Sequence, residues 1–406
     1  MDLQIFTPNV PTDRPEMLTP DAPIQPYDGY LVPGQDEKAR RLGARCAAAV
    51  RDNKIADFER SEDYCRRRGE TDPDRMVHVS TFLRLDGMIY MTYYANTSTA
   101  AEDPLHQQAR LAFCPEARPE ELTVLTVQKV GDTLGGKTID MLYDTILLYK
   151  GGDELYILWT ASADGLYYRF YCVYNRKTGT FGPIRPNRFR VGGVTNDFST
   201  TGIVDALTAA GLPHKMMFSD IGIMQKLTTR TENGETWYYT GAYSGYFNCI
   251  IKSRDLVTWD YVATPDFLNL SLWENAVYVV GDRCFYFVRQ YDCQQGFLTC
   301  YDLVAGRWTV PTLIRDTQSR SDFIWWQGEL YLIHGPLDRN GFGVVRVNRD
   351  CLAKSEPVLV ADLGGSCFYP FARVEGEDIY LSYTVDRQHI RLSRFPAAML
   401  SGGDAE

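Results

Sequence analysis

Acidic side chains recur at one position of a repeated unit along this chain. Each unit opens with a short first strand, and four of these strands carry an acid at their head: Asp144, Asp220, Glu274 and Asp322. Carboxyl groups that converge shift one another's pKa, so that one can serve as an acid and another as a base. Glycosidic bond cleavage needs such a pair, one carboxyl to protonate the leaving oxygen and one to act as base or nucleophile.

The first strands of the first and last units carry His78 and Tyr369 at their heads. A histidine titrates near neutral pH, so His78 is a candidate general acid or base. Together with Tyr369 it could remove and deliver protons in a β-elimination from a uronic acid. The predicted catalytic set is therefore Asp144, Asp220, Glu274, His78 and Tyr369.

Further polar and aromatic residues lie in the loops between second and third strands, which should open at the same end of the molecule. Aromatic rings beside hydrogen-bonding groups suit sugars. Arginine forks suit carboxylates, and three arginines fall near predicted channel positions of the last three units, which favours an acidic sugar. The predicted substrate-binding residues are Asp164, Tyr243, Tyr246, Arg289, Tyr291, Arg320, Asp322, His334 and Arg387.

The elements that position these residues are short strands. Alternating apolar segments such as 88–94, 155–159 and 330–334 are bounded by Gly and Asp turn residues. About four such strands make up each unit, and six units follow one another along the chain. This pattern predicts an all-β fold, a six-bladed β-propeller with a five-bladed one as the alternative.

The N-terminal region differs from the repeats. Residues 8–70 are predicted to be extended and helical decoration, with a proline-rich part to residue 35 and one or two helices over 36–68. The last unit shows only three strands, so we expect residues 1–7 to supply its closing strand, which would remove an exposed edge. Another short helix is expected at 203–210, and residues 1–406 are read as a single domain.

Composition narrows the classes of partner. The 42 Lys and Arg against 52 Asp and Glu give a net charge of −10, which disfavours nucleic acid and anionic membrane surfaces. No apolar run of about 18 residues exists, and residues 1–10 lack the pattern of a secretory signal. The ten cysteines show no Cys-x-x-Cys spacing and are predicted to be free core thiols of a cytoplasmic protein. No cofactor or metal site is predicted, although converging acids are compatible with a channel cation such as calcium.

Two short segments resemble motifs of known families. Arg230-Thr-Glu-Asn-Gly-Glu-Thr-Trp237 is similar to the Asp-box of sialidases, with Gly234, Thr236 and Trp237 matching but Arg and Glu in place of Ser and Asp. Ser253-Arg-Asp-Leu-Val-Thr-Trp259 resembles a turn of propeller glycosidases such as arabinanases, fructosidases and mannoside phosphorylases. The resemblance implies a carbohydrate-active propeller over residues 70–395, with both motifs in structural roles.

The resemblance also implies roles for the candidate residues. The order Asp144, Asp220, Glu274 is similar to that of arabinanase-type enzymes, which implies a base, an orienting acid and a general acid; in those enzymes, however, the base lies on the first blade, where this chain has His78. Sialidases bind a carboxylate with three arginines beside a Tyr/Glu nucleophile pair, which Tyr369 with Glu274 would imitate.

Three functions follow as hypotheses. The first is an exo-acting glycoside hydrolase on a small oligosaccharide, with an acidic sugar favoured. The second is a lyase on uronate-containing glycans that uses His78 and Tyr369. The third is a non-catalytic sugar-binding propeller, in which the channel acids are structural. No oligomeric state is predicted.

Overall fold

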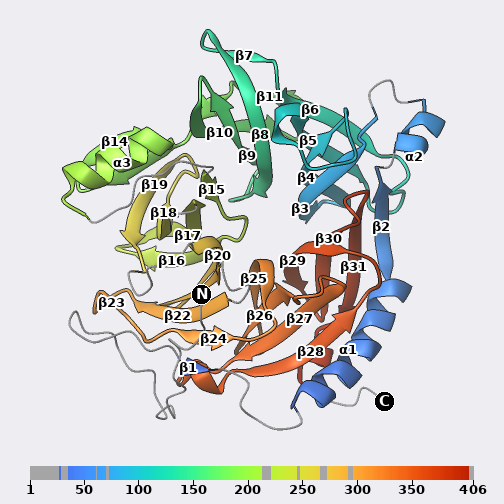
Figure 1. Cartoon of the computed structure of the whole chain (residues 1–406), viewed down its shortest axis with the longest axis vertical. Helices are drawn as coiled ribbons and strands as arrows, with labels where there is room; N and C mark the ends of the chain where they lie inside the picture. The colour runs from blue at the N-terminus through green and yellow to red at the C-terminus, as the bar shows by residue number, and fades with distance from the viewer. Residues whose placement is uncertain are drawn as a thin grey trace.

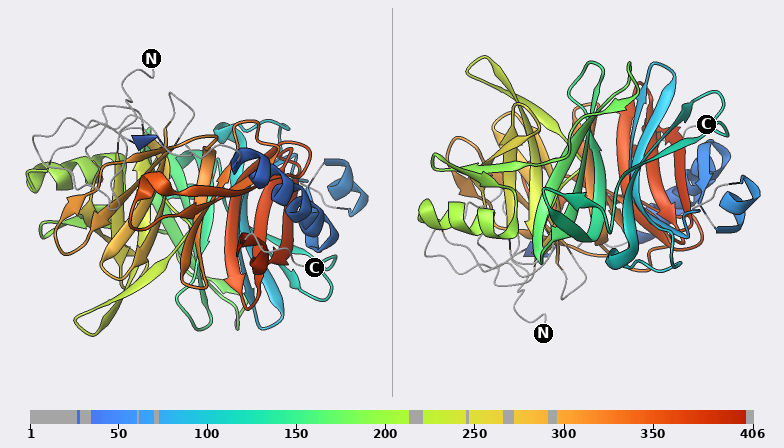
Figure 2. Two further views of the ribbon diagram at one scale, coloured as in Figure 1. Left: turned by 90° about the horizontal axis from the view of Figure 1, so that it is seen from below. Right: turned by 90° about the horizontal axis from the view of Figure 1, so that it is seen from above.

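The computed structural model describes residues 27–28, 35–60, 62–69, 73–212, 221–244, 247–265, 272–290 and 296–401. The sheets stand side by side in a ring around a central axis (Figure 1), so the fold is a β-propeller, as predicted. In the side views of Figure 2 the helix α1 (Gln35–Asp52) lies along the outside of the ring.

Hydrogen bonding groups the described strands into six sheets of at least four strands each. The first sheet contains β3 (Met76–Leu85), β4 (Met88–Asn96), β5 (Gln107–Pro115) and β6 (Thr123–Lys129). The second sheet contains β7 (Thr133–Leu134), β8 (Lys137–Leu148), β9 (Glu154–Ala163), β10 (Leu166–Asn175), β11 (Thr180–Phe181) and β12 (Arg185–Pro186). The third sheet contains β13 (Arg188–Val191), β14 (Val194–Asp197), β15 (Ile221–Ile223), β16 (Thr228–Glu232), β17 (Glu235–Ser244), β18 (Asn248–Ser253) and β19 (Thr258–Ala263).

The other three sheets follow in the same way. The fourth sheet contains β20 (Leu272–Val280), β21 (Arg283–Gln290), β22 (Gly296–Asp302), β23 (Arg307–Trp308) and β24 (Thr312–Ile314), together with β1 (Tyr27–Asp28). The fifth sheet contains β25 (Gln318–Trp326), β26 (Glu329–Gly335), β27 (Gly341–Val347) and β28 (Glu356–Asp362). The sixth sheet contains β29 (Cys367–Glu375), β30 (Asp378–Val385) and β31 (His389–Pro396), together with β2 (Lys54–Glu59).

The innermost strands share an irregularity that the sequence pattern does not reveal. In five of the six sheets the register between the first and second strands shifts, at 78–81, 143–146, 272–275, 318–322 and 368–371. The shift lies near the start of the first strand in four of these sheets and in the middle of β8 in the other. Val79, Asp144, Ser319 and Tyr369 take a positive φ at these points, which is uncommon for residues other than glycine. Bulges of this kind re-aim side chains, and here they lie where the candidate residues stand.

The closing strand of the last sheet corrects one prediction. Strand β2 pairs antiparallel with β31, with Glu59 opposite His389, and thereby completes the sheet formed by β29, β30 and β31. Residues 1–7, expected in this place, lie outside the described residues. The segment 36–68 is thus a helix, a strand and a second helix, α2 (Glu62–Arg67), rather than helices alone.

Helix α1 packs against β28 on the outer side of the fifth sheet. A Cβ at Gly43 would lie 1.8 Å from the Val360 carbonyl oxygen, so only glycine allows this close approach of helix and strand. The helix expected near 203–210 is α3 (Thr200–Ala209), whose N-cap Ser199 accepts a hydrogen bond from the Gly202 amide. Short 3₁₀ helices occupy Pro104–His106, Leu352–Lys354 and Ala397–Ser401.

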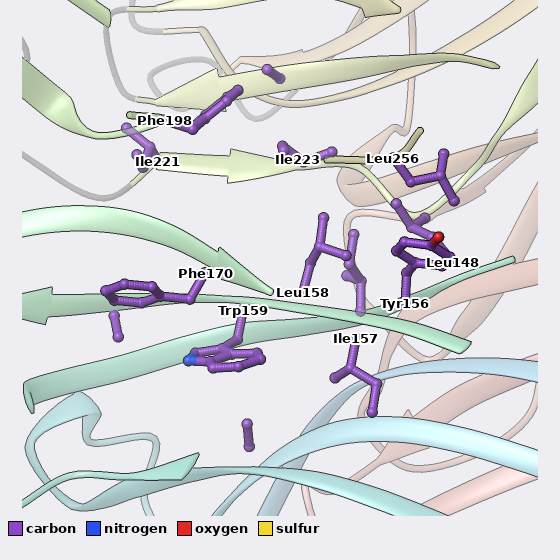
Figure 3. Packing of buried hydrophobic residues seen from close by; sticks show 14 of the residues in the cluster. Leu148, Tyr156, Ile157, Leu158, Trp159, Phe170, Phe198, Ile221, Ile223 and Leu256 are labelled. Atoms are coloured by element: carbon purple, nitrogen blue, oxygen red, sulfur yellow. The ribbon is translucent and has the colours of Figure 1, made fainter. Parts of the chain in front are cut away.

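The core lies between neighbouring sheets, where side chains of successive blades interleave. Figure 3 shows one such layer, in which Leu158 of the second sheet points toward Ile223 of the third, while its neighbour Trp159 points to the opposite side. The resemblance at Ser253–Trp259 identifies a structural turn correctly: Ser253 Oγ accepts from the Leu256 amide at 2.9 Å, and Trp259 is fully buried.

The cysteines and the helices bear on two further predictions from the sequence. Cys172 and Cys249 are buried free thiols within strands, as expected for small core residues. None of the helices in the described ranges combines the length and the apolar character that crossing a membrane requires.

The closing strand generates a test of stability. Asp57 on β2 accepts hydrogen bonds from His389 Nδ1 at 3.0 Å, Lys54 Nζ at 3.0 Å and Arg391 Nε at 3.1 Å. Burial raises the pKa of Asp57, but these hydrogen bonds and the Arg391 charge lower it by more, so the pKa lies well below its usual range. A depressed carboxyl pKa stabilises the fold above the unfolded value of about 3.9 and ceases to do so as the pH falls through the folded value.

We expect Asp57→Asn to lower the free energy of unfolding by about 1 kcal/mol at neutral pH, because the pair is only partly buried. The difference from wild type should shrink below about pH 4, where the carboxyl protonates in the unfolded chain. Urea unfolding across pH measures both effects. Glu235→Gln, which breaks an exposed pair with Arg254, is the control and should cost less. A constant difference down to pH 2 would contradict the assignment.

Candidate active site

A buried arginine occupies the centre of the ring. Arg320 on β25 is 1% exposed, and its Nη2 lies 2.5 Å from Asp144 Oδ1 and 3.3 Å from Glu274 Oε1. Asp144 is on β8 and Glu274 on β20, strands that line the middle of Figure 1 together with β25 and β29. The predicted acids of two units therefore converge, as expected, but they converge on a guanidinium group rather than on each other.

Asp144 is enclosed by donors. Its Oδ2 accepts from Arg169 Nη1 at 3.1 Å and from the Tyr243 hydroxyl at 3.0 Å. Burial raises the pKa of Asp144, but the charges of Arg320 and Arg169 lower it by more, and the net pKa is below its ordinary value. The group is thus a carboxylate whose oxygens already face donors. This geometry supports a charge partner for two arginines rather than the general base that the resemblance implied.

Glu274 is held between two arginines. Its Oε1 faces Nε and Nη2 of Arg320, each at 3.3 Å, and its Oε2 accepts from Arg289 Nη1 at 2.8 Å. Both oxygens therefore act as acceptors from N–H donors. Because both oxygens of Glu274 already accept from arginines, neither faces an acceptor in the described part of the chain to which it could deliver a proton, which disfavours the general-acid role implied for Glu274.

Tyr369 on β29 lies beside Arg320. Its ring centroid is 5.0 Å from Arg320 Cζ, and its φ of 54° places it at the bulge of the innermost strand. Burial raises the pKa of Tyr369 and the Glu274 carboxylate raises it further, while the charges of Arg289 and Arg320 offset part of the shift. The phenol is therefore protonated at neutral pH, and it needs a neighbouring base such as Glu274 to become a nucleophile.

His78 on β3 stacks on Tyr369 with ring centroids 4.5 Å apart. Its imidazole also contacts Phe368 and Tyr94 edge-on, and the residue is 1% exposed. Burial lowers the pKa of His78 well below its ordinary value, and the Arg387 charge lowers it further. His78 is thus neutral at neutral pH, so it lacks the proton that a general acid would donate.

The rim of the site contains a carboxyl group that sequence reasoning did not select. Glu102, just before the 3₁₀ helix 104–106, accepts a hydrogen bond from the Tyr94 hydroxyl and lies 2.8 Å from Arg387 Nη2. Its side chain is 35% exposed, against 3% for Glu274. His106, in the same loop, pairs with Asp103 at 2.8 Å, and Glu102 makes the contacts at the site.

Three arginines lie near Tyr369 and its neighbour Phe368. Arg339 and Arg387 place their guanidinium carbons 5.3 Å and 4.7 Å from the Phe368 ring centroid, and Arg289 pairs with Glu274 and interacts with Tyr369. Burial lowers the pKa of Arg339, and the charges of Arg289 and Arg387 lower it further. Arg387 pairs with Glu102, but among the described residues no carboxylate lies within ion-pair distance of Arg339.

Several predicted binding residues lie away from this cluster. Asp322 is fully buried, pairs with Lys226 Nζ at 3.0 Å and accepts from the Ala372 amide at 3.0 Å, which is a structural role. His334 is buried in β26 with Nδ1 3.2 Å from the Gly335 carbonyl oxygen. Asp164 is exposed in the β9–β10 turn. Three further predicted residues lie outside the described residues: Asp220, Tyr246 and Tyr291.

The residues missed at the sequence level are Glu102, Arg169 and Arg339. Arg339 and Glu102 stand in loops between second and third strands, the same signal that singled out Arg387, and that signal could have found them. Arg169 lies in the middle of β10, where nothing in the pattern separates it from a solvent-facing arginine. Within the described ranges, no group of three or more His, Cys, Asp or Glu side chains is placed to hold a metal ion.

Solved structures of sialidases resemble this ring of sheets, as do glycoside hydrolases at lower scores. The Trypanosoma rangeli sialidase in complex with sialic acid matches with a TM-score of 0.51 at 12% identity, over 80% of this chain and 55% of that one. The Hadza microbial sialidase Hz136 matches with 0.55 at 10% identity, over 81% and 67%. The intramolecular trans-sialidase from Ruminococcus gnavus, bound to oseltamivir carboxylate, matches with 0.51 at 10% identity, over 87% and 99%.

These likenesses establish the class of fold, a sialidase-like β-propeller. This chain spans about half the length of the Trypanosoma rangeli enzyme. No protein-family model matches the sequence, and no curated protein sequence does so either. At identities this low the likeness shows the fold alone, and function depends on the residues of the site.

The burial of Asp144 between Arg169 and Arg320 predicts that loss of its charge strongly destabilises the fold. Asp144→Asn would leave Arg169 and Arg320 with one buried carboxylate fewer, and removal of one member of a buried pair typically costs about 3–5 kcal/mol. We expect a loss of about 3 kcal/mol in chemical unfolding at neutral pH. Glu102→Gln, at the partly exposed rim, should cost less than about 1 kcal/mol. An Asp144→Asn protein as stable as wild type would contradict this description of the centre.

Proposed function

We propose that the protein is a glycoside hydrolase that removes an acidic sugar from the end of a small oligosaccharide. One observation carries the proposal: Arg289, Arg339 and Arg387 gather beside the Tyr369–Glu274 pair, and Arg339 has no carboxylate partner among the described residues. An anionic ligand would complete this arrangement of charges.

Charge and geometry both favour a carboxylate as that anion. Like charges that are brought together in a partly desolvated place repel one another, and an incoming anion relieves this repulsion. A guanidinium fork matches the two oxygens of a carboxylate, which a neutral sugar does not offer. His78, Phe368 and Tyr94 are buried against one another beside Tyr369, so they support the Tyr369 ring from within the protein.

The chemistry then divides among three residues. Tyr369 attacks the anomeric carbon as its phenolic proton passes to Glu274, and the bond to the leaving oxygen breaks. Glu102, the exposed carboxyl group of the site, is displaced from Arg387 by the sugar carboxylate and delivers the proton to the leaving oxygen. Water next cleaves the sugar–tyrosine bond, Glu102 takes one proton from that water, and Glu274 returns a proton to Tyr369. A neutral phenol suits this attack, because a carboxylate nucleophile would be repelled by the carboxylate of the sugar.

Exo-action and a cytoplasmic location are further parts of the proposal. Glu274 is buried and Tyr369 is partly buried, which supports a site that takes only the end of a sugar chain. Buried free thiols such as Cys172 and Cys249 support a reducing compartment. Cell fractionation with an antibody against the chain would test the location.

A lyase remains the second candidate, because His78 stacks directly on Tyr369. Elimination from a uronate leaves a carbon–carbon double bond conjugated with the carboxylate, whereas hydrolysis leaves none. Ultraviolet absorbance of the product therefore separates the two reactions. A rise in absorbance that is lost in His78→Asn would favour the lyase over the hydrolase.

The nucleophile pair gives the first activity test. On aryl glycosides of acidic sugars, Tyr369→Phe and Glu274→Gln should each lower kcat at least about 1000-fold, because each removes a group that acts in the bond-breaking step. Tyr383→Phe is the matched control, a buried tyrosine of the same sheet whose ring packs in the core. Its kcat should stay at the wild-type value. Wild-type kcat in both active-site variants would exclude the mechanism and leave a binding propeller.

The arginines give a test of substrate charge. We expect Arg339→Met to lower kcat/KM for an aryl glycoside of an acidic sugar about 10- to 100-fold. This fall corresponds to the loss of one hydrogen bond to a charged group, which contributes about 1.5–3 kcal/mol. The value for the matched neutral glycoside should be unchanged. Arg346→Met on β27, where the arginine pairs with Glu356 on the surface, controls for loss of an arginine from the same sheet. An equal fall for both substrates would mean that Arg339 does not bind a carboxylate.

A further inference from the structure

Arg320 makes contacts that neither charge neutralisation nor ligand binding explains. Its Nε donates to Glu274 Oε1, and its Nη2 lies 3.3 Å from the same oxygen. At the same time the guanidinium faces Asp144, the Tyr243 hydroxyl at 3.2 Å and Gln225 Oε1 at 3.4 Å. These partners come from β8, β17, β20 and the segment after β15, so one side chain joins three sheets to its own. At 1% exposure it is too deep to meet a substrate.

The contacts determine how the Glu274 carboxylate is turned. Arg320 takes Oε1 and Arg289 takes Oε2, so the carboxylate plane is set by two guanidinium groups on opposite sides. Nε and Nη2 reach the same oxygen only because the guanidinium group is planar with donors at set angles. A lysine ammonium at this place would keep the charge but could not hold Asp144 and Glu274 in the same fixed directions.

Arg320 also adjoins the other member of the pair. Its Cζ lies 5.0 Å from the Tyr369 ring centroid, within the range of a cation–π contact. Arg320 is itself held by Asp144, which Arg169 holds from the far side at 3.1 Å. The order Arg169, Asp144, Arg320, Glu274, Arg289 is a row of alternating charges that contains Glu274, the proposed base for Tyr369.

We propose that Arg320 is a positioning residue, which sets the orientation of Glu274 relative to Tyr369 without touching the substrate. This inference rests on the proposed function for its kinetic consequence, but the orientation itself can be measured separately. The arginines at the rim bind the ligand, whereas Arg320 acts only through Glu274.

The first variant is Arg320→Lys, which keeps the charge and removes the planar fork. We expect kcat for the acidic aryl glycoside to fall about 100-fold with KM within threefold of wild type, because the rim arginines remain intact. Arg60→Lys is the matched control: Arg60 is also buried and pairs with buried Asp74 at 3.4 Å, in a separate network. Its kcat should equal that of wild type. A similar loss of kcat in both variants would overturn the proposal, since it would reflect general loosening.

A second variant guards against misfolding. Arg320→Gln leaves two balanced pairs, Arg169 with Asp144 and Arg289 with Glu274, so no buried acid is stranded. It should fold, as followed by thermal unfolding, and show the same loss of kcat at nearly constant KM. Wild-type kcat in Arg320→Gln would overturn the proposal.

Crystal structures of wild type and Arg320→Lys provide a readout that needs no activity. We expect the Glu274 carboxylate to rotate, so that the 2.8 Å contact between its Oε2 and Arg289 Nη1 lengthens beyond hydrogen-bonding distance. An unmoved Glu274 would overturn the proposal whatever the kinetics. If the wild-type enzyme cleaves no acidic glycoside, the proposed function fails, and the rotation of Glu274 alone then decides the role of Arg320.

Discussion

The alternation of charge at the axis of the ring is the constraint on which the site depends. Burial of five charged side chains is costly unless each charge meets an opposite one with good hydrogen-bond geometry. Here each carboxylate lies between two arginines, and Arg320 lies between two carboxylates. Because the five residues come from three different sheets, the sheets must keep their places around the ring for the charges to stay paired. Fold and site therefore stabilise each other.

The bulges in the innermost strands make this arrangement accessible. In a regular strand, side chains alternate between the two faces of the sheet, so position alone would decide which face Asp144 and Tyr369 occupy. Here the register shifts and positive φ values turn both residues toward the axis of the ring. Such backbone strain persists only where the surroundings hold it. Around Asp144 the hydrogen bonds from Arg169 and Tyr243 do so, and around Tyr369 the stacked His78 ring and the Arg320 guanidinium do so.

Depth separates the tasks of the arginines. Arg169 and Arg320 are fully buried and bonded on several sides, so they serve the protein itself. Arg339 and Arg387 lie nearer the surface and both adjoin the Phe368 ring, where an incoming anion can reach them. Residues of one type thus take different roles because their access to solvent differs. An arginine in the sequence carries no mark of which role it will have.

The sequence by itself determined the propeller, because period-two strands bounded by turn residues can bury their apolar faces only as stacked sheets. It also determined the turn at 253–259 and the convergence of Asp144, Glu274 and Tyr369, since heads of repeated units meet at one axis. The tertiary structure decided which residue of each head reaches that axis. A register shift places Arg320 there instead of Asp322, two positions later, and a separate strand, β2, completes the last sheet. Both outcomes depend on contacts between residues far apart in the chain, which local patterns do not contain.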